Sequence, residues 1–152
     1  MKKITLDSDG TDYTAINFGT LDKLYEHSLI HPKTQQEIKG KVFLKDATHA
    51  TGTEISFNAI PPKTEVPYFH THKADEETYI VLKGAGDFQV NDTCFPISEG
   101  SVVRVATGAT RGLRNSSDEQ MVYIVIQSKE NSLDAYSGED GYRTEFNPKW
   151  DR

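Results

Sequence analysis

The sequence predicts an all-β protein, folded as an antiparallel sandwich or barrel, from three observations. Nine short runs with strand-like composition follow one another, at residues 42–45, 53–60, 67–71, 78–83, 87–90, 93–95, 101–105, 111–115 and 121–127. Turn-forming pairs such as Pro61-Pro62, Asn91-Asp92 and Thr107-Gly108 separate the runs. No long helical pattern lies between them, which is typical of antiparallel folds. The Asn91-Asp92 pair, placed between two runs, predicts a tight hairpin.

The chain is expected to form one domain over residues 1–152. We expect the β core at about 42–127, an N-terminal arm at 1–41 and an irregular C-terminal tail at 128–152. Residues 1–19 alternate weakly and could form an edge strand. Thr20 can cap a short helix that ends before Pro32, in which four apolar residues recur at helical spacing: Leu21, Leu24, Tyr25 and Leu29.

Composition and charge narrow the class of protein. Of the 152 residues 36% are hydrophobic and 26% charged, which is typical of a globular domain, and the net charge is −6. An acidic surface argues against a nucleic-acid partner, because such proteins bind the phosphate backbone through Lys and Arg clusters. No apolar run approaches the roughly 20 residues needed to span a bilayer, and residues 1–7 lack the apolar segment of a signal peptide. With Cys94 as the only cysteine, no intrachain disulfide forms, and we expect a cytoplasmic protein.

A candidate metal site lies between residues 68 and 77. Side chains alternate across a strand, so His70 and His72 would share a face, with Tyr68 beside them. Glu77 opens the next apolar run. If the two runs pair as neighbours, two imidazoles and one carboxylate meet. That donor set suits one divalent ion such as Fe(II), Mn(II), Ni(II) or Zn(II).

Two spaced motifs resemble those of the cupin superfamily, in particular its small single-domain conserved-barrel members. The first cupin motif reads G-x5-H-x-H-x3-4-E-x6-G, and here His70-x-His72-x4-Glu77-x6-Gly84 is similar to it. The second motif reads G-x5-P-x-G-x2-H-x3-N, and here Gly100-x5-Ala106-x-Gly108-x2-Arg111-x3-Asn115 is similar. The resemblance covers Thr64 to Asn115.

The resemblance implies a double-stranded β-helix, or jelly-roll, barrel that holds one metal ion inside. It implies that His70, His72 and Glu77 match three of the four usual ligands. Thr64 and Ala106 depart from the motifs at loop positions. Arg111 departs at the fourth ligand, where a histidine belongs. A guanidinium stays protonated and has no lone pair to donate to a metal, so the three-His-one-Glu set cannot form.

Three interpretations of Arg111 remain open. In the first, the three remaining ligands hold the metal, and Arg111 binds a carboxylate or phosphate of a substrate. In the second, Arg111 pairs with Glu77 in a metal-free protein. In the third, Gln89, Tyr68 or Tyr123 supplies the fourth ligand. A guanidinium about 6 Å from a dication costs about 5 kcal/mol at an effective dielectric of 20. That cost is tolerable if Glu77 or a bound anion lies between them.

The face that carries Glu77 also predicts the lining of a pocket. Tyr79 and Val81 share that face, and Leu113 alternates with Arg111. The cupin resemblance implies an interior that is apolar around the metal, so we expect these residues to line the pocket. The candidate substrate-binding residues are Arg111, Tyr68, Tyr79, Val81 and Leu113. Asn115 is expected to close a turn. No catalytic residue can be assigned from the sequence.

Different classes of function follow from these residues. One is a metal-dependent enzyme that acts on a small organic anion. Its reaction would be an oxygenation if the metal is iron, or else an isomerisation or a decarboxylation. Another is a metal-free barrel that binds a small molecule, such as a sugar or sugar acid, without catalysis. The cupin resemblance also implies a homodimer in which a terminal strand, here within residues 1–19, pairs with the neighbouring subunit.

Overall fold

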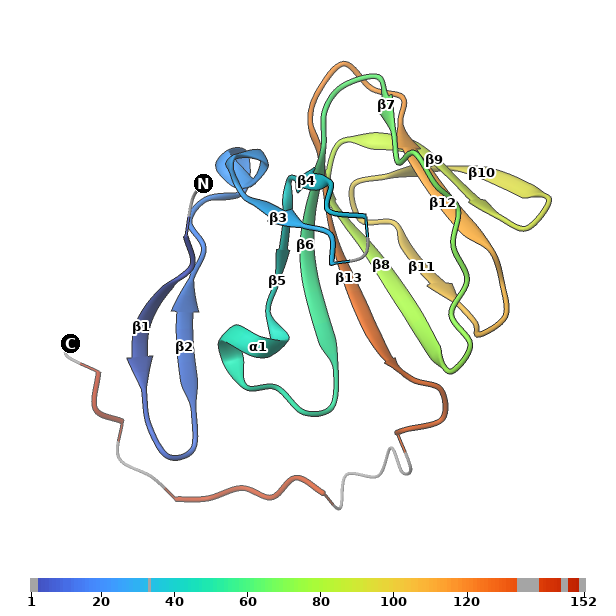
Figure 1. The fold of residues 1–152 in the computed structure, drawn as a ribbon. Helices are drawn as coiled ribbons and strands as arrows, with labels where there is room; N and C mark the ends of the chain where they lie inside the picture. Colours follow the sequence, from blue (N-terminus) through green and yellow to red (C-terminus); the bar gives the residue numbers. More distant parts are fainter. Residues whose placement is uncertain (1–2, 33, 134–139, 146–147, 151–152) are drawn as a thin grey trace.

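Two antiparallel β-sheets form the body of the protein (Figure 1). The computed structural model describes residues 3–32, 34–133, 140–145 and 148–150. One sheet has the strand order β10-β9-β12-β7 and the other β11-β8-β13-β6-β5. Their bounds are β5 (Lys41–Phe43), β6 (Glu54–Ile60), β7 (Thr64–Glu65), β8 (Asp75–Lys83), β9 (Ala85–Val90), β10 (Thr93–Ser98), β11 (Val102–Val105), β12 (Arg111–Asn115) and β13 (Met121–Lys129). The predicted all-β jelly-roll class is confirmed.

Side-chain alternation decides which residues enter the space between the sheets. Along β8, Glu77, Tyr79 and Val81 are buried in turn, as expected for a strand with one face toward a core. The core cluster joins β8 and β13 to residues of the opposite sheet, among them Phe88, which is fully buried. Val90 pairs with Thr93 across a two-residue loop in which Asn91 has φ 49°, so the predicted Asn91-Asp92 hairpin is confirmed.

The N-terminal arm covers the outer face of the five-stranded sheet. Its elements are β1 (Thr5–Asp9), β2 (Thr14–Asn17), the 3-10 helix η1 (Leu21–Glu26), β3 (Ser28–Ile30) and β4 (Glu37–Lys39); the short helix α1 (Lys45–Thr48) follows β5. Leu24 of η1 is fully buried against Val42, Ala59 and Val122. The apolar residues on this side of the sheet are therefore buried by the arm, and not by the opposite sheet.

Two expectations for the arm need correction. The predicted edge strand at residues 1–19 is not seen over the described residues 3–19, where β1 and β2 pair with each other as a hairpin. The predicted helix also ends earlier than expected: η1 stops at Glu26, and the chain then forms β3, which pairs with β4.

No helix among the described residues is long and apolar enough to cross a membrane. In the tail, Tyr142 and Trp150 are 88% and 76% exposed.

Asn115, at the end of β12, joins two loop segments, at residues 60–61 and 117–119. Its side chain is buried, and Nδ2 donates to the carbonyl oxygens of Ile60, Pro61 and Glu119 at 3.1, 2.9 and 2.6 Å. Its Oδ1 accepts from the backbone nitrogen and the hydroxyl of Ser117 at 2.9 and 2.7 Å. The side chain thus closes a turn, as expected from the sequence, and gives a hydrogen-bond partner to carbonyl groups of both loops.

Replacing Asn115 with Ala should lower the free energy of unfolding by about 2 to 4 kcal/mol, because several buried or partly buried hydrogen bonds are lost at once. Urea unfolding followed by circular dichroism measures the change. Ser116→Ala is the matched control, since that neighbouring side chain is exposed. Equal effects of the two substitutions would contradict the role given to Asn115.

Candidate metal centre

The three candidate ligands come from two different parts of the fold. Glu77 is the third residue of β8, in the five-stranded sheet. His70 lies in an extended segment that makes a single antiparallel bridge with Arg111 of β12, in the four-stranded sheet. Two backbone hydrogen bonds form this bridge, from His70 N to Arg111 O (3.1 Å) and from Arg111 N to His70 O (3.0 Å). His72 follows, and its carbonyl accepts from Gly108 N at 2.9 Å.

This arrangement corrects the predicted route by which the ligands meet. The sequence predicts a strand at residues 67–71 paired with the following run, but these residues contain only the bridge at His70. The partners of β8 are β11 and β13. The histidines approach Glu77 from the opposite sheet, across the interior of the jelly roll, and not from a neighbouring strand of the same sheet.

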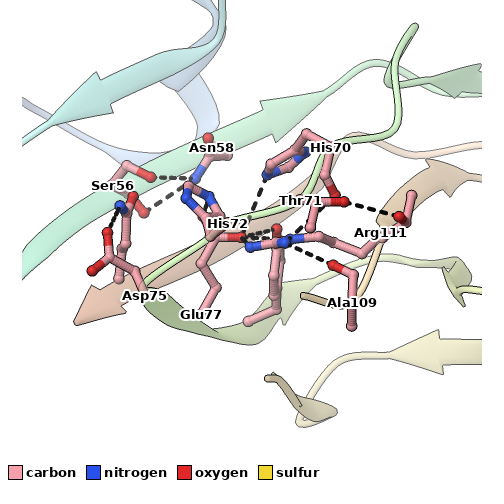
Figure 2. A network of polar contacts seen from close by, with 12 residues as sticks. Ser56, Asn58, His70, Thr71, His72, Asp75, Glu77, Ala109 and Arg111 are labelled. Carbon is pink, nitrogen blue, oxygen red and sulfur yellow. Dashed lines mark hydrogen bonds and ion pairs between the residues drawn. The ribbon is translucent and has the colours of Figure 1, made fainter. Parts of the chain in front are cut away.

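The geometry of the three side chains suits a metal ion (Figure 2). Nε2 of His72 lies 3.1 Å from Oε1 of Glu77, and Nε2 of His70 lies 3.5 Å from Oε2. The three ligand atoms all lie within 4.8 Å of one another. Metal–ligand bonds of about 2.1 Å that meet at roughly right or tetrahedral angles place neighbouring ligand atoms about 3.0 to 3.4 Å apart. The donor set therefore fits a divalent ion.

Glu77 is buried, and its two oxygens have different partners. Oε2 accepts hydrogen bonds from the Tyr79 hydroxyl (2.6 Å) and from Nε and Nη2 of Arg111 (2.9 and 2.7 Å), and Nε2 of His70 lies 3.5 Å from it. Oε1 contacts His72. Burial alone raises the pKa of Glu77, but hydrogen bonds from His70, Tyr79 and Arg111, with the arginine's charge, hold the pKa well below its usual value. Burial and the Glu77 charge raise the pKa of Tyr79, so its hydroxyl remains a donor.

Arg111 is fully buried, and all of its nitrogens are used. Besides the two bonds to Glu77, Nη1 donates to the carbonyl oxygens of Ala109 (3.0 Å) and His70 (3.4 Å). The guanidinium therefore pairs with Glu77, as the second interpretation of this residue required. Its contact with a substrate anion stays a prediction.

The His70 ring is held less firmly than the other two ligands. Its Nδ1 is buried and has no hydrogen-bond partner among the described residues, and its Nε2 makes only the 3.5 Å contact with Glu77. The ring lies edge-on to that of His72, with 5.3 Å between centroids. A cation bound to Nε2 would replace this long contact with Glu77, while Nδ1 would still need a partner of its own.

A cavity of about 200 Å³ adjoins the three ligands. Tyr68, Tyr79 and Leu113 line it, as the sequence predicts, and so does Tyr123, whose pKa is raised by burial. Val81 belongs instead to the core cluster. Gln89 lines a different hollow of about 430 Å³, on the face of the four-stranded sheet that carries Asp87 and Arg114. None of the three ligands lines that second hollow.

One wall of the cavity is polar, which corrects the expectation of an apolar interior. The residues concerned are Lys41 of β5, Glu54, Ser56 and Asn58 of β6, and Gln127 of β13. The alternation Glu-Ile-Ser-Phe-Asn at 54–58 carries the signal, but a sequence does not say which face of such a strand points inward. Here Phe57 and Ala59 pack under the N-terminal arm, so the polar face of β6 lies toward the cavity.

Comparison with known proteins supports the fold that the sequence predicts. A family model described as a cupin domain matches residues 57–127. A cupin protein from Bacteroides fragilis is 32% identical over 69% of this chain and 89% of its own, with a TM-score of 0.66. A predicted oxalate decarboxylase from Thermotoga maritima is 22% identical over 68% of this chain and 90% of its own, with a TM-score of 0.56. The second likeness bears on the fold alone. No curated protein matches the chain.

Replacing Arg111 with Met should lower the free energy of unfolding by about 3 to 5 kcal/mol, because Glu77 would be left as a buried charge without its counter-ion. The double substitution Arg111→Met, Glu77→Gln should recover part of that loss. Urea unfolding in the presence of EDTA measures both.

The matched control for this cycle is Arg114→Met, on the same strand. Arg114 pairs with Asp87 at 2.7 Å, as Arg111 does with Glu77, but at the surface. Solvent screens such a pair, so its loss should affect stability far less. Equal effects at the two positions would contradict a buried counter-ion role for Arg111.

Proposed function

Since the chain belongs to the cupin family, we propose that it binds one divalent metal ion through two histidines and one carboxylate, and a small organic anion beside it. The ligand atoms are Nε2 of His70, Nε2 of His72 and Oε1 of Glu77. The adjoining cavity is the site for the organic molecule. The metal is Fe, Mn, Ni or Zn, the ions that such a donor set accepts.

The observation that carries the proposal is that the two oxygens of Glu77 have different partners. Oε2 is bound by Tyr79 and Arg111 and has Nε2 of His70 at 3.5 Å, while Oε1 has Nε2 of His72 at 3.1 Å and no other partner among the described residues. A carboxylate used in this way stands between the guanidinium and a cation on the histidine side. That is the condition under which the repulsion between Arg111 and a dication becomes tolerable.

The remaining coordination positions of the ion would face the cavity. A divalent ion held by two histidines and a carboxylate supplies Lewis-acid chemistry and, if it is iron, oxygen chemistry. Arg111 and the protonated Tyr79 fix the orientation of Glu77, a role that supporting groups commonly have around metal ligands. An oxygenase and an isomerase remain the two enzyme classes that this arrangement suits.

A second candidate function is a metal-free binder, and one observation favours it. The charge of Glu77 is compensated by Arg111 without a metal, and both histidines lie close enough to donate to the carboxylate. In that case the cavity would hold a small sugar or sugar acid without turnover. The metal content of the protein separates the two candidates.

A homodimer is also part of the proposal. Every residue of β1 is exposed, and among the described strands β1 pairs only with β2, which leaves a strand edge available to a second subunit. A cytoplasmic location remains an expectation from the sequence.

Protein purified without a histidine tag from iron- and manganese-replete cells should contain close to one equivalent of metal. His72→Ala and Glu77→Gln should each reduce this to about a tenth or less, since each removes one of three ligands. Elemental analysis by mass spectrometry measures the content, and thermal unfolding checks that the variants fold.

His49→Asn is the control for the metal measurement. His49 is exposed, lies outside the cavity and has φ 58°, a conformation that asparagine also adopts. It should leave the metal content unchanged. Less than about a tenth of an equivalent in the unmodified protein would favour the metal-free binder.

A further inference from the structure

Lys41 lies in the wall of the cavity that contains the candidate metal ligands. It begins β5, the edge strand of the five-stranded sheet (Figure 1), and pairs with Asn58 of β6. Its side chain shares the cavity with His70 and His72, which come from the opposite sheet. Lys41 precedes residues 57–127, which match the cupin family model. A feature of this chain outside the matched region therefore places a cation in the cavity.

The Lys41 ammonium has few partners in the protein. Nζ lies 4.5 Å from the centroid of the Phe43 ring, and within the described ranges it makes no hydrogen bond or ion pair. Burial lowers the pKa of Lys41, while the charges of Glu77 and Glu54 raise it from a distance. Both carboxylates have other partners: Oε1 of Glu54 accepts from two backbone nitrogens, and Oε2 of Glu77 from Arg111 and Tyr79.

Lys41 is partly buried, and a partly desolvated ammonium is stabilised when its three donors meet acceptors. The protein supplies none among the residues described, and only the weak attraction of an aromatic face. An anion in the cavity would meet this need directly. It would lie between Lys41 on one side and the histidines with Glu77 on the other.

The neighbours of Lys41 narrow the kind of anion. Asn58 donates through Nδ2 to the carbonyl oxygen and the hydroxyl of Ser56 at 3.1 and 3.0 Å. This leaves Oδ1 of Asn58 as an acceptor for which the described part of the chain offers no donor. A molecule that matches this wall has an anionic group for the ammonium of Lys41 and a hydroxyl group that donates to Oδ1 of Asn58. A cavity of about 200 Å³ holds roughly seven water volumes, so the molecule is small.

We propose that Lys41 binds the carboxylate of a small hydroxycarboxylic acid in the cavity and so orients this ligand toward His70, His72 and Glu77. The proposal rests on the ligand cavity of the preceding section, but not on the presence of a metal. Lys41 is a specificity-determining residue in this account, and the amide of Asn58 receives a hydroxyl group of the same ligand.

Calorimetric titration tests the proposal with glycolate, malate and gluconate as probes and with glycerol and sorbitol as their neutral counterparts. The unmodified protein should bind at least one of the carboxylates and bind the neutral polyols more weakly. Lys41→Met should weaken carboxylate binding by roughly ten- to a hundred-fold, the usual effect of losing a charge-assisted hydrogen bond. Lys41→Arg should stay within a few-fold of the unmodified protein.

Lys45→Met is the matched control, because Lys45 is an exposed lysine four residues further along the chain. It should not change the affinity. Thermal unfolding checks each variant, and Lys41→Gln is a second neutral variant. If neither neutral variant folds, NMR of ¹³C-methylated lysines in the otherwise unmodified protein gives the answer, with Lys41→Arg used to assign the signal. That signal should shift on addition of the carboxylate.

Three results would overturn the inference: equal carboxylate affinity with and without Lys41, equal affinity for the neutral polyols, or no binding of any probe carboxylate. Titrations in EDTA and with one equivalent of Mn²⁺ separate this inference from the metal proposal. Lys41-dependent carboxylate binding by a protein that takes up no metal would leave this inference standing and remove the metal. Metal uptake without carboxylate binding would support the metal site and overturn the inference on Lys41.

Discussion

The buried carboxylate of Glu77 is the constraint on which the rest of the site depends. It belongs to the five-stranded sheet, whereas Arg111 and the bridge that carries His70 belong to the four-stranded sheet. A charge in that position is stable only with donors around it, and the opposite sheet provides most of them. The ion pair of 2.7 Å between Arg111 and Glu77 therefore joins the two sheets, and the strand that carries Arg111 also holds His70 beside Glu77. The same interaction stabilises the fold and arranges the site.

Arginine at the fourth ligand position of the family changes the charge of the centre. Glu77 and Arg111 cancel each other, so a dication bound by the remaining ligands would keep most of its charge and attract an anion. Lys41 adds a further positive group to the lining of the cavity. The loss of one metal ligand and the presence of a lysine outside the family-matched residues thus favour the same kind of ligand. Both features concern selectivity, whereas the jelly roll itself is common to many functions.

Local patterns in the sequence were sufficient for the fold class, the hairpin at Asn91-Asp92 and the spacing of His70, His72 and Glu77. Long-range packing decided what they could not show. The segment at 67–71 forms no strand because its single bridge to β12 replaces the expected pairing. The polar face of β6 turns inward because the N-terminal arm buries the apolar one, and the alternation within β6 alone does not say which face meets the arm. Lys41 was missed for the same reason, since its place in the cavity depends on that orientation.

A crystal structure of protein saturated with Mn²⁺, with anomalous data collected at the metal edge, tests the central claim most directly. The account predicts one anomalous peak about 2.0 to 2.3 Å from Nε2 of both histidines and from one oxygen of Glu77. It also predicts that the other oxygen stays paired with Arg111. No peak at saturating metal, with Glu77 still bound to His72 and Arg111, would contradict the account. So would an ion held by a Glu77 side chain that has turned away from Arg111.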